Sequence, residues 1–297
     1  MKYVFLILAF ILVSCSSIKK KNAVATEVGP EVVFEVTQGI LHPESIIYSP
    51  KHEKFFVSNV SSGNPLETKS VGYLSKISKD GKIVTEKWIT GFKAPKGIAI
   101  VGDDLYVTDI NRVVKVSISK AKIAKVFPVK NAKFLNDVTA DNEGNIYISD
   151  TLSDIIYRIK DNKIDQWLKD DRVAGSHGLY TDGKEHIIAT KWGADVDPKT
   201  LVAKGLGDIA VISLKNQNEI TVVKDLQGQL DGIAVDGKGT LWISDWITGN
   251  VFTMTKQGKV SKMFNLGQGT ADISVARELG LLLVPQMLQN KILFIKL

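Results

Sequence analysis

The stretch LDGIAVDGKGTLWISDW, residues 230–246, decides the fold of this chain. Apolar residues occupy alternate positions on both sides of its centre, as Ile233 and Val235 do in the first half, and this is the period of a β-strand with two different faces. The central DGKG, residues 236–239, is a tight-turn sequence rich in residues that tolerate positive φ. The stretch therefore predicts a strand, a hairpin turn and a second strand.

The same pattern recurs along the chain. Its copies are residues 43–59, 95–109, 135–150, 176–190, 230–245 and, in degraded form, 270–286. Aligned on the hairpin, one column holds Glu44, Lys96, Asn136, His177, Asp231 and Ala271, at successive spacings of 52, 40, 41, 54 and 40 residues. A period in the forties built from such units is typical of a β-propeller with about four strands per blade. Six copies predict an all-β, six-bladed β-propeller with four-stranded antiparallel blades.

The ends of the domain predict how the ring closes. Residues 31–38, EVVFEVTQ, read as a strand before the first repeat, whereas the last repeat offers only three strands, at 273–275, 281–284 and 292–295. An N-terminal strand that completes the last blade would remove the exposed sheet edges. We therefore expect residues 31–297 to form one propeller closed by its first strand.

The first fifteen residues are typical of a targeting segment. Lys2 is followed by an apolar run at 4–13 that is too short to span a bilayer as a helix. The run ends in LVSC, which resembles the lipobox of bacterial lipoproteins, and Cys15 is the only cysteine of the chain. We expect residues 1–15 to be a lipoprotein signal peptide, Cys15 to carry lipid and residues 16–30 to be a flexible tether. The predicted location is the cell envelope, on a membrane that faces the periplasm or the exterior.

Charge distribution and missing motifs limit the classes of partner that this protein is expected to bind. The net charge is +6, but the lysines are spread over the repeats, and their one run, at residues 19–21, fits a tether near a membrane better than a nucleic-acid site. The sequence lacks a Walker loop, a nucleophile elbow and a dinucleotide fingerprint in a strand–helix context. The expected partners are a small-molecule substrate and a membrane bound through the lipid anchor, with neither nucleic acid nor nucleotide.

The column residues are the candidate site. The start of each first strand and the end of each second strand share one face of the ring, so the column side chains should converge on the central channel. Acidic and amide side chains gathered there are typical of a site for a hard cation. Asp109, Asp150 and Asp245 recur at one repeat position and are interpreted as structural. The long segment between Ala189 and Ile209 is expected to be a binding loop.

Three motifs resemble one family. PES at 43–45, LNDVTADNEGNIYISD at 135–150 and LDGIAVDGKGTLWISD at 230–245 are similar to those of the senescence-marker-protein/gluconolactonase/luciferin-regenerating-enzyme family of six-bladed propellers. The resemblance implies a divalent metal in the channel, commonly calcium, and hydrolysis of lactones or related esters. Carried over by position, the implied metal ligands are Glu44, His177 and Asp231, and Asn136 would lie beside the substrate.

Two positions depart from the family pattern. His177 stands where the family has an asparagine ligand, and a neutral imidazole suits zinc, manganese or iron better than calcium. The resemblance implies calcium, with zinc or manganese as alternatives because of His177, unless His177 acts on the substrate instead or the site is degenerate. Lys96 would weaken metal binding by repulsion, or it would hold an anionic substrate.

The resulting hypothesis is an envelope-anchored, metal-dependent lactonase or ester hydrolase. The metal would polarise the lactone carbonyl, and Asp231 or His177 would take the proton from the attacking water. Asn136 and Lys96 would orient the substrate, and the ring of Trp192 would line the mouth of the central channel. The alternative is a non-catalytic propeller lipoprotein that binds a small ligand or a protein on the same face.

Overall fold

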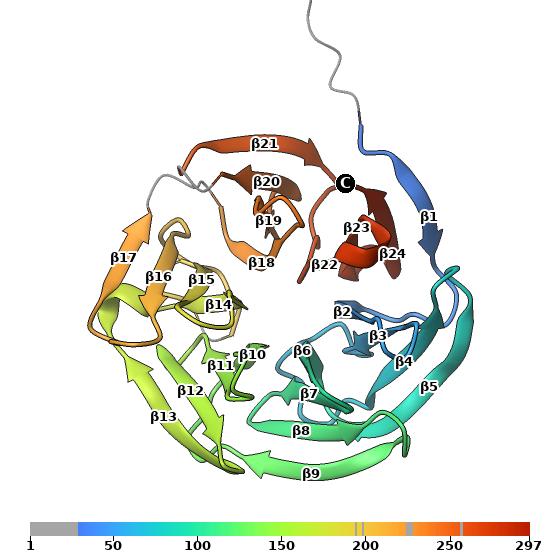
Figure 1. The fold of residues 1–297 in the computed structure, drawn as a ribbon, viewed down its shortest axis with the longest axis horizontal. Coiled ribbons are helices and arrows are strands. Elements are labelled where there is room, and N and C mark those ends of the chain that lie inside the picture. Colours follow the sequence, from blue (N-terminus) through green and yellow to red (C-terminus); the bar gives the residue numbers. More distant parts are fainter. Residues whose placement is uncertain (1–28, 194, 198, 224–227, 256–257) are drawn as a thin grey trace, which may run out of the picture.

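The computed structural model describes residues 29–297 except 194, 198, 224–227 and 256–257. Within this part of the chain six four-stranded sheets form a ring, the six-bladed β-propeller (Figure 1), which confirms the predicted fold. The predicted signal peptide with Cys15, and the tether as far as residue 28, lie outside the described residues. Three short 3₁₀ helices, η1 (Asp171–Val173), η2 (Arg277–Leu279) and η3 (Met287–Gln289), join strands. No helix of the described part is long and apolar enough to cross a membrane.

Each of the first five blades runs in chain order from an inner strand at the channel to an outer strand at the rim. The first blade is β2 (Pro43–Ser49), β3 (Lys54–Asn59), β4 (Gly72–Ser78) and β5 (Ile83–Phe92). The second is β6 (Pro95–Val101), β7 (Asp104–Asp109), β8 (Arg112–Ser117) and β9 (Lys122–Pro128). The third is β10 (Leu135–Ala140), β11 (Ile146–Asp150), β12 (Ile155–Lys160) and β13 (Lys163–Lys169). The fourth is β14 (Ser176–Thr181), β15 (His186–Lys191), β16 (Ile209–Ser213) and β17 (Ile220–Val223). The fifth is β18 (Leu230–Val235), β19 (Leu241–Asp245), β20 (Asn250–Met254) and β21 (Val260–Asn265).

The sixth blade closes the ring with both ends of the chain. Its strands are β22 (Ser274–Ala276), β23 (Leu281–Gln286), β24 (Lys291–Lys296) and, outermost, β1 (Val32–Val36). In Figure 1 the blue β1 lies along the red β24, and the two pair antiparallel with Phe34 opposite Phe294. The rings of these two residues stack with their centroids 4.1 Å apart. The predicted closure by the N-terminal strand is confirmed.

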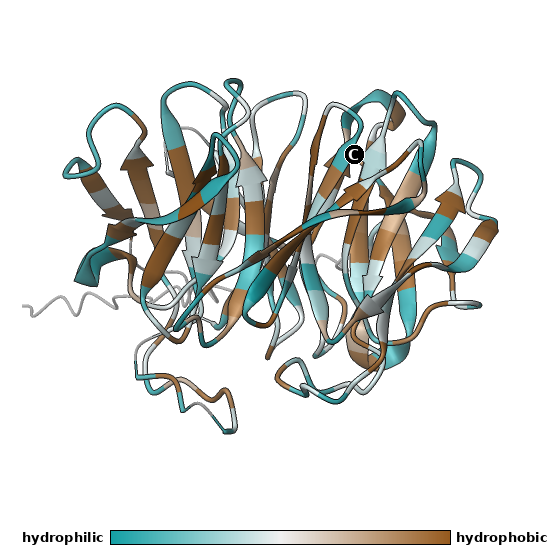
Figure 2. Cartoon of the chain, turned by 90° about the horizontal axis from the view of Figure 1, so that it is seen from below, coloured by the Kyte–Doolittle hydropathy of each residue, from teal (hydrophilic) through white to brown (hydrophobic). Residues whose placement is uncertain are grey.

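Apolar side chains fill the spaces between neighbouring blades. Between the sixth and the first blade, for example, Phe55 and Phe294 are fully buried and meet edge to face with their centroids 5.0 Å apart. Figure 2 shows the ring from the side, coloured by hydropathy, with apolar bands across the strands and mostly polar turns at their ends. Alternation along each strand therefore places apolar residues in the gaps between blades and holds the ring together.

Glycine lets the inner strands approach one another closely. It follows the column residue in three blades, at Gly97, Gly178 and Gly232. A Cβ atom at Gly178 would stand 2.2 Å from the carbonyl oxygen of Asp231, in the next blade. One at Gly232 would stand 2.2 Å from the amide nitrogen of Ile273, again across a blade boundary. Only glycine fits at these boundaries, so the column residues of adjacent blades are held in close register.

A set of buried hydroxyl groups ties the same boundaries. Each lies on the second strand of a blade, one residue before its last position, and donates to the column residue of the following blade. The four bonds run from Thr108 to the carbonyl of Asn136, from Ser149 to His177 (2.6 Å), from Thr190 to Asp231 (2.6 Å) and from Ser244 to Ala271 (2.7 Å). The hydroxyls thereby fix the backbone of the residues that point into the channel.

Candidate functional site

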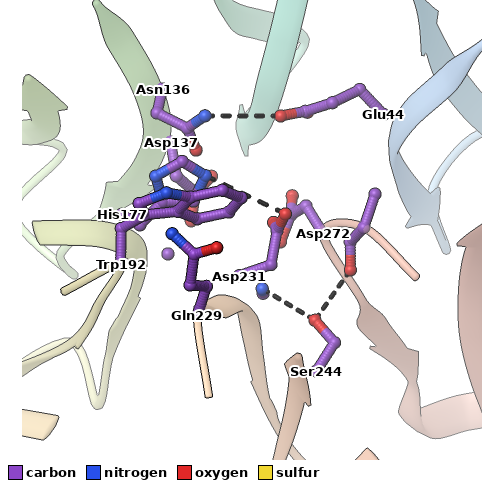
Figure 3. Close-up of polar contacts among 12 residues, drawn as sticks. Glu44, Asn136, Asp137, His177, Trp192, Gln229, Asp231, Ser244 and Asp272 are labelled. Atoms are coloured by element: carbon purple, nitrogen blue, oxygen red, sulfur yellow. Dashed lines mark hydrogen bonds and ion pairs between the residues drawn. The ribbon is translucent and has the colours of Figure 1, made fainter. Parts of the chain in front are cut away.

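The predicted column residues converge on one cavity. It has a volume of about 280 Å³, and its floor carries Glu44, Asn136, His177 and Asp231. These four side chains come from the inner strands β2, β10, β14 and β18, and each is the second residue of its strand. Figure 3 shows them facing one another. All four are at least nine-tenths buried.

Two carboxylate oxygens on the floor have no partner. The amide of Asn136 lies 3.5 Å from Glu44 Oε1, a long contact, and the other oxygen of Glu44, Oε2, has no hydrogen-bond partner among the described residues. Asp231 Oδ1 is likewise buried and unpartnered within that part of the chain. Burial, and then the neighbouring Asp231 and Asp272 carboxyls, raise the pKa of Glu44 well above its usual range. Burial and Asp272 do the same to the pKa of Asp231.

His177 is held as a neutral ring with one free nitrogen. The Thr151 hydroxyl donates its single hydrogen to the carbonyl of Ser176 at 2.9 Å, so it accepts the bond from His177 Nδ1 at 3.0 Å. The proton therefore sits on Nδ1, and the lone pair of Nε2 lies 3.9 Å from Asp231 Oδ2. Burial and the nearby Lys96 cation lower the pKa of His177 to about 3, which keeps the imidazole neutral at physiological pH.

The floor has the donor chemistry of a cation site. Carboxyl oxygens and an imidazole lone pair are metal-ligating atoms, and two such oxygens have no hydrogen-bond partner among the described residues. The described residues contain no group of three His, Cys, Asp or Glu side chains already drawn together as metal ligands. Glu44, His177 and Asp231 would thus fit a divalent cation by donor type.

Lys96 lies behind the cavity wall. Its side chain is fully buried, and its ammonium group donates to the carbonyls of Ala94 at 3.0 Å and Pro65 at 3.3 Å. It also lies 4.9 Å from the ring centroid of Phe134, which lines the cavity, whereas Lys96 itself does not. Burial lowers the pKa of Lys96 to about 8, against the opposing effect of Glu44. In this position the cation acts on the site through its charge.

The loop between β15 and β16 supplies part of the wall. Trp192 stacks against His177 with ring centroids 4.4 Å apart, and its indole nitrogen donates to the carbonyl of Leu201 at 2.7 Å. Leu201 lines the cavity together with its neighbours Thr200 and Val202. Trp246 faces the same space, 6.4 Å from Trp192. The long segment therefore lies where the sequence places a binding loop.

A second layer of carboxyls lies further down the channel. Asp137 accepts from the backbone amides of Val138 and Leu179, both at 2.6 Å, and Asp272 accepts from the Ser45 hydroxyl at 2.6 Å. Both line a separate hollow of about 290 Å³ between the inner strands. Burial raises the pKa of Asp272 to about 7, while the Ser45 hydrogen bond acts in the opposite direction. The channel thus holds more buried carboxyl groups than cations to neutralise them.

This charge imbalance predicts an unusual pH dependence. In metal-free protein, folding raises the pKa of Asp272 from an ordinary 3.8 to about 7, so the folded state binds a proton that the unfolded chain does not. The Glu44 and Asp231 carboxyls, whose pKa values are also raised, act in the same direction. Lys96 opposes them near pH 8, because its pKa is lowered to about 8 and only the unfolded lysine is then fully protonated. We therefore expect the melting temperature in chelator to rise as the pH falls from 7.5 to 6.5. Below about 6.5 the lowered pKa of His177 opposes the gain, because only the unfolded histidine then takes up a proton.

Calorimetry of chelated protein across this range tests the dependence. Asp272→Asn should flatten the rise between pH 7.5 and 6.5, since asparagine keeps the shape but cannot titrate. A melting temperature that stays constant or falls over that interval in the wild-type protein would contradict the expectation.

The repeated aspartates at the second-strand ends make structural contacts. Asp150 accepts from the amides of Lys133 and Phe134 at 3.0 and 2.8 Å. Asp109 does the same for the equivalent loop before β6 and also forms an ion pair with Arg112 at 2.7 Å. The hydroxyls that precede these aspartates are the residues that sequence reasoning missed. Their signal was present as the repeated Thr-Asp or Ser-Asp at 108–109, 149–150 and 244–245.

The sequence of this chain was compared with those of known protein families. Residues 42–275 match the family described as the SMP-30/Gluconolactonase/LRE-like region. No curated protein sequence matches the chain.

Solved structures share the fold at low identity. A structural-genomics target assigned as a gluconolactonase superposes with a TM-score of 0.65 at 16% identity, covering 91% of this chain and 92% of its own. Virginiamycin B lyase from Staphylococcus aureus gives 0.59 at 18% identity, covering 85% and 81%. A propeller from a nidogen/laminin complex gives 0.60 at 14% identity, covering 73% and 83%. At these identities the likeness concerns the fold alone.

Proposed function

Because the chain belongs to the SMP-30/gluconolactonase/LRE-like family, we propose that it is a divalent-metal-dependent hydrolase of lactones or related esters. One observation carries the proposal: among the described residues Glu44 Oε2 and Asp231 Oδ1 are buried without a hydrogen-bond partner, and the other Asp231 oxygen lies 3.9 Å from Nε2 of His177. Leaving such groups unpaired costs about 1–3 kcal/mol each, so their presence favours a ligand that satisfies them.

Each floor residue has a part in this mechanism. A bound divalent cation would supply Lewis acidity toward the lactone carbonyl. Glu44, His177 and Asp231 would hold it, and the neutral imidazole favours zinc or manganese over calcium. Asp231 or His177 would take the proton from the attacking water, and Asp231 Oδ1 is available for it because no described residue hydrogen-bonds to that oxygen. Asn136 makes only a long contact to Glu44, so its amide is available to orient the substrate.

Metal content tests the first part of the proposal. We expect about one divalent ion per chain in the purified protein by elemental analysis, and its loss in the double variant Glu44→Gln/Asp231→Asn. Asp150→Asn, which removes a buried carboxylate outside the cavity, is the matched control and should keep the ion. Protein that binds none of calcium, zinc or manganese would overturn the metal-dependent mechanism.

A non-catalytic propeller that binds a small ligand or protein on this face is the second candidate. The observation that favours it is that the described residues hold no preformed group of three metal ligands. Absence of both metal and hydrolysis, with ligand binding retained in the cavity, would establish this alternative.

We also propose that the propeller is a lipoprotein of the cell envelope. The support is the LVSC sequence at 12–15 and the absence of any other cysteine from the chain. Cys15→Ser should move the protein from the membrane fraction to the soluble fraction of the native host. Unchanged membrane association of this variant would contradict a lipid anchor on Cys15.

A further inference from the structure

The walls of the cavity differ in character from its floor. Above the four polar floor residues the cavity is enclosed by aromatic and aliphatic side chains, among them Phe134, Trp192, Trp246, Leu201 and Met287. The indole nitrogen of Trp192 is occupied by the carbonyl of Leu201. The ring therefore offers the cavity an apolar surface.

Polar partners for a substrate are scarce above the floor. Among the described residues the only other polar side chains of the lining are Thr200 and Gln268, and the lining includes neither lysine nor arginine. The Lys96 ammonium group does not belong to the lining, and it lies over the ring of Phe134, 4.9 Å from the centroid. A polyhydroxylated or anionic substrate would leave several of its polar groups unpaired here, and each would lose affinity.

On the basis of the function proposed above, we propose that the substrate is a lactone or ester that carries an apolar chain, and that it is not a sugar lactone. The reacting carbonyl would lie at the floor near Asn136 and Asp231, and the apolar part would lie against Trp192, Trp246 and Met287. Burying each methylene group against these walls favours binding by removing apolar surface from water.

The mouth of the cavity continues the apolar surface outward. Val202 and Ile247 line the cavity, yet their side chains remain 58% and 42% exposed. Ile247 also lines a neighbouring hollow together with Leu206 and Phe252. Ile247 lines both spaces. A substrate alkyl chain longer than the cavity would therefore pass out of the cavity across Ile247 and lie toward Leu206.

Hydrolysis of a homologous series tests the substrate class. We would compare δ-valerolactone, δ-octalactone and δ-decalactone with glucono-δ-lactone, using the full chain loaded with its metal. The expected result is that kcat/KM increases about fourfold for each added methylene that becomes buried. Glucono-δ-lactone should react more slowly than the alkyl lactones of the same ring size.

Two variants test where the alkyl chain of the substrate lies. Ile247→Asn should remove most of the gain in kcat/KM between δ-octalactone and δ-decalactone. Val71→Asn is the matched control, since Val71 is 75% exposed in the β3–β4 loop and lines neither space. The control should keep the wild-type dependence on chain length.

A binding measurement separates this inference from the proposed function. Titration of Asp231→Asn with each lactone can be followed by tryptophan fluorescence, because Trp192 and Trp246 line the cavity. Chain-length-dependent binding without wild-type hydrolysis would support the apolar ligand and overturn the hydrolase. If kcat/KM is highest for glucono-δ-lactone, or does not depend on the length of the alkyl chain, the result would support the hydrolase and overturn the apolar substrate. Neither binding nor turnover would overturn both.

Discussion

Replacing Asp231 with asparagine is expected to lower lactone hydrolysis by about 10²–10⁴-fold, the usual contribution of a positioned proton acceptor. The same variant should raise the stability of the metal-free protein. The reason is that Asp231 is buried with one oxygen unpartnered, and its raised pKa records the cost of ionising it there. Loss of activity together with a gain in stability is the signature of a residue kept for function.

For Asp150→Asn, at an aspartate that is just as deeply buried, we expect the opposite result: lower stability and unchanged activity. Its carboxylate accepts from two backbone amides, so the change should cost about 1–3 kcal/mol of unfolding free energy while kcat stays near the wild-type value. Steady-state kinetics and urea unfolding of the two variants measure both quantities. An Asp231→Asn protein that keeps its turnover would remove Asp231 from the mechanism.

The second large effect is expected at the blade boundary beside His177. In Gly178→Ala the new methyl group would stand 2.2 Å from the Asp231 carbonyl and 2.8 Å from the Thr190 hydroxyl. These atoms form the hydrogen bond that joins the fourth and fifth blades, so the clash cannot be relieved by turning one flexible side chain. We expect the free energy of unfolding to decrease by more than about 4 kcal/mol, or the variant to fail to fold.

Gly237→Ala is the control for that change. Gly237 lies in the β18–β19 hairpin, where a Cβ atom would meet nothing within 4 Å, and its φ is not in the left-handed region. Thermal unfolding should therefore leave this variant within a few degrees of the wild type. If Gly178→Ala melted at the same temperature as Gly237→Ala, the close approach of the inner strands would not be essential.

Much of the fold could be predicted because the chain repeats itself. Six copies of a strand–hairpin–strand unit specify the number of blades, and the column Glu44, Asn136, His177 and Asp231 reaches one cavity because equivalent positions in a ring face the same axis. The closing strand was also predictable, because a blade with three strands leaves an unpaired edge.

The rest depended on contacts between blades, which a repeat does not encode. The sequence places Lys96 in the same column as the floor residues, yet its long side chain bends to the carbonyls of Ala94 and Pro65. The proton on His177 is set by Thr151, a residue just beyond the repeated unit of the preceding blade. The apolar walls combine residues such as Phe134 and Met287 from loops of different blades, so their meeting depends on the closed ring.

The pairing of β1 with β24 has a consequence for biosynthesis. The strand β1 is made first and has no partner until β24 has been made, so the ring cannot be completed before the chain has been synthesised through Lys296. Until then Val32–Val36 is an edge strand awaiting a neighbour, and the apolar faces of β23 and β24 are not yet in place to cover Phe34 and Phe55. A chain cut short before Lys291 would keep this gap permanently, with open edges on both sides of it, and would be exposed to aggregation or proteolysis. Completion of the ring thus requires that every strand from β1 to β24 has been synthesised.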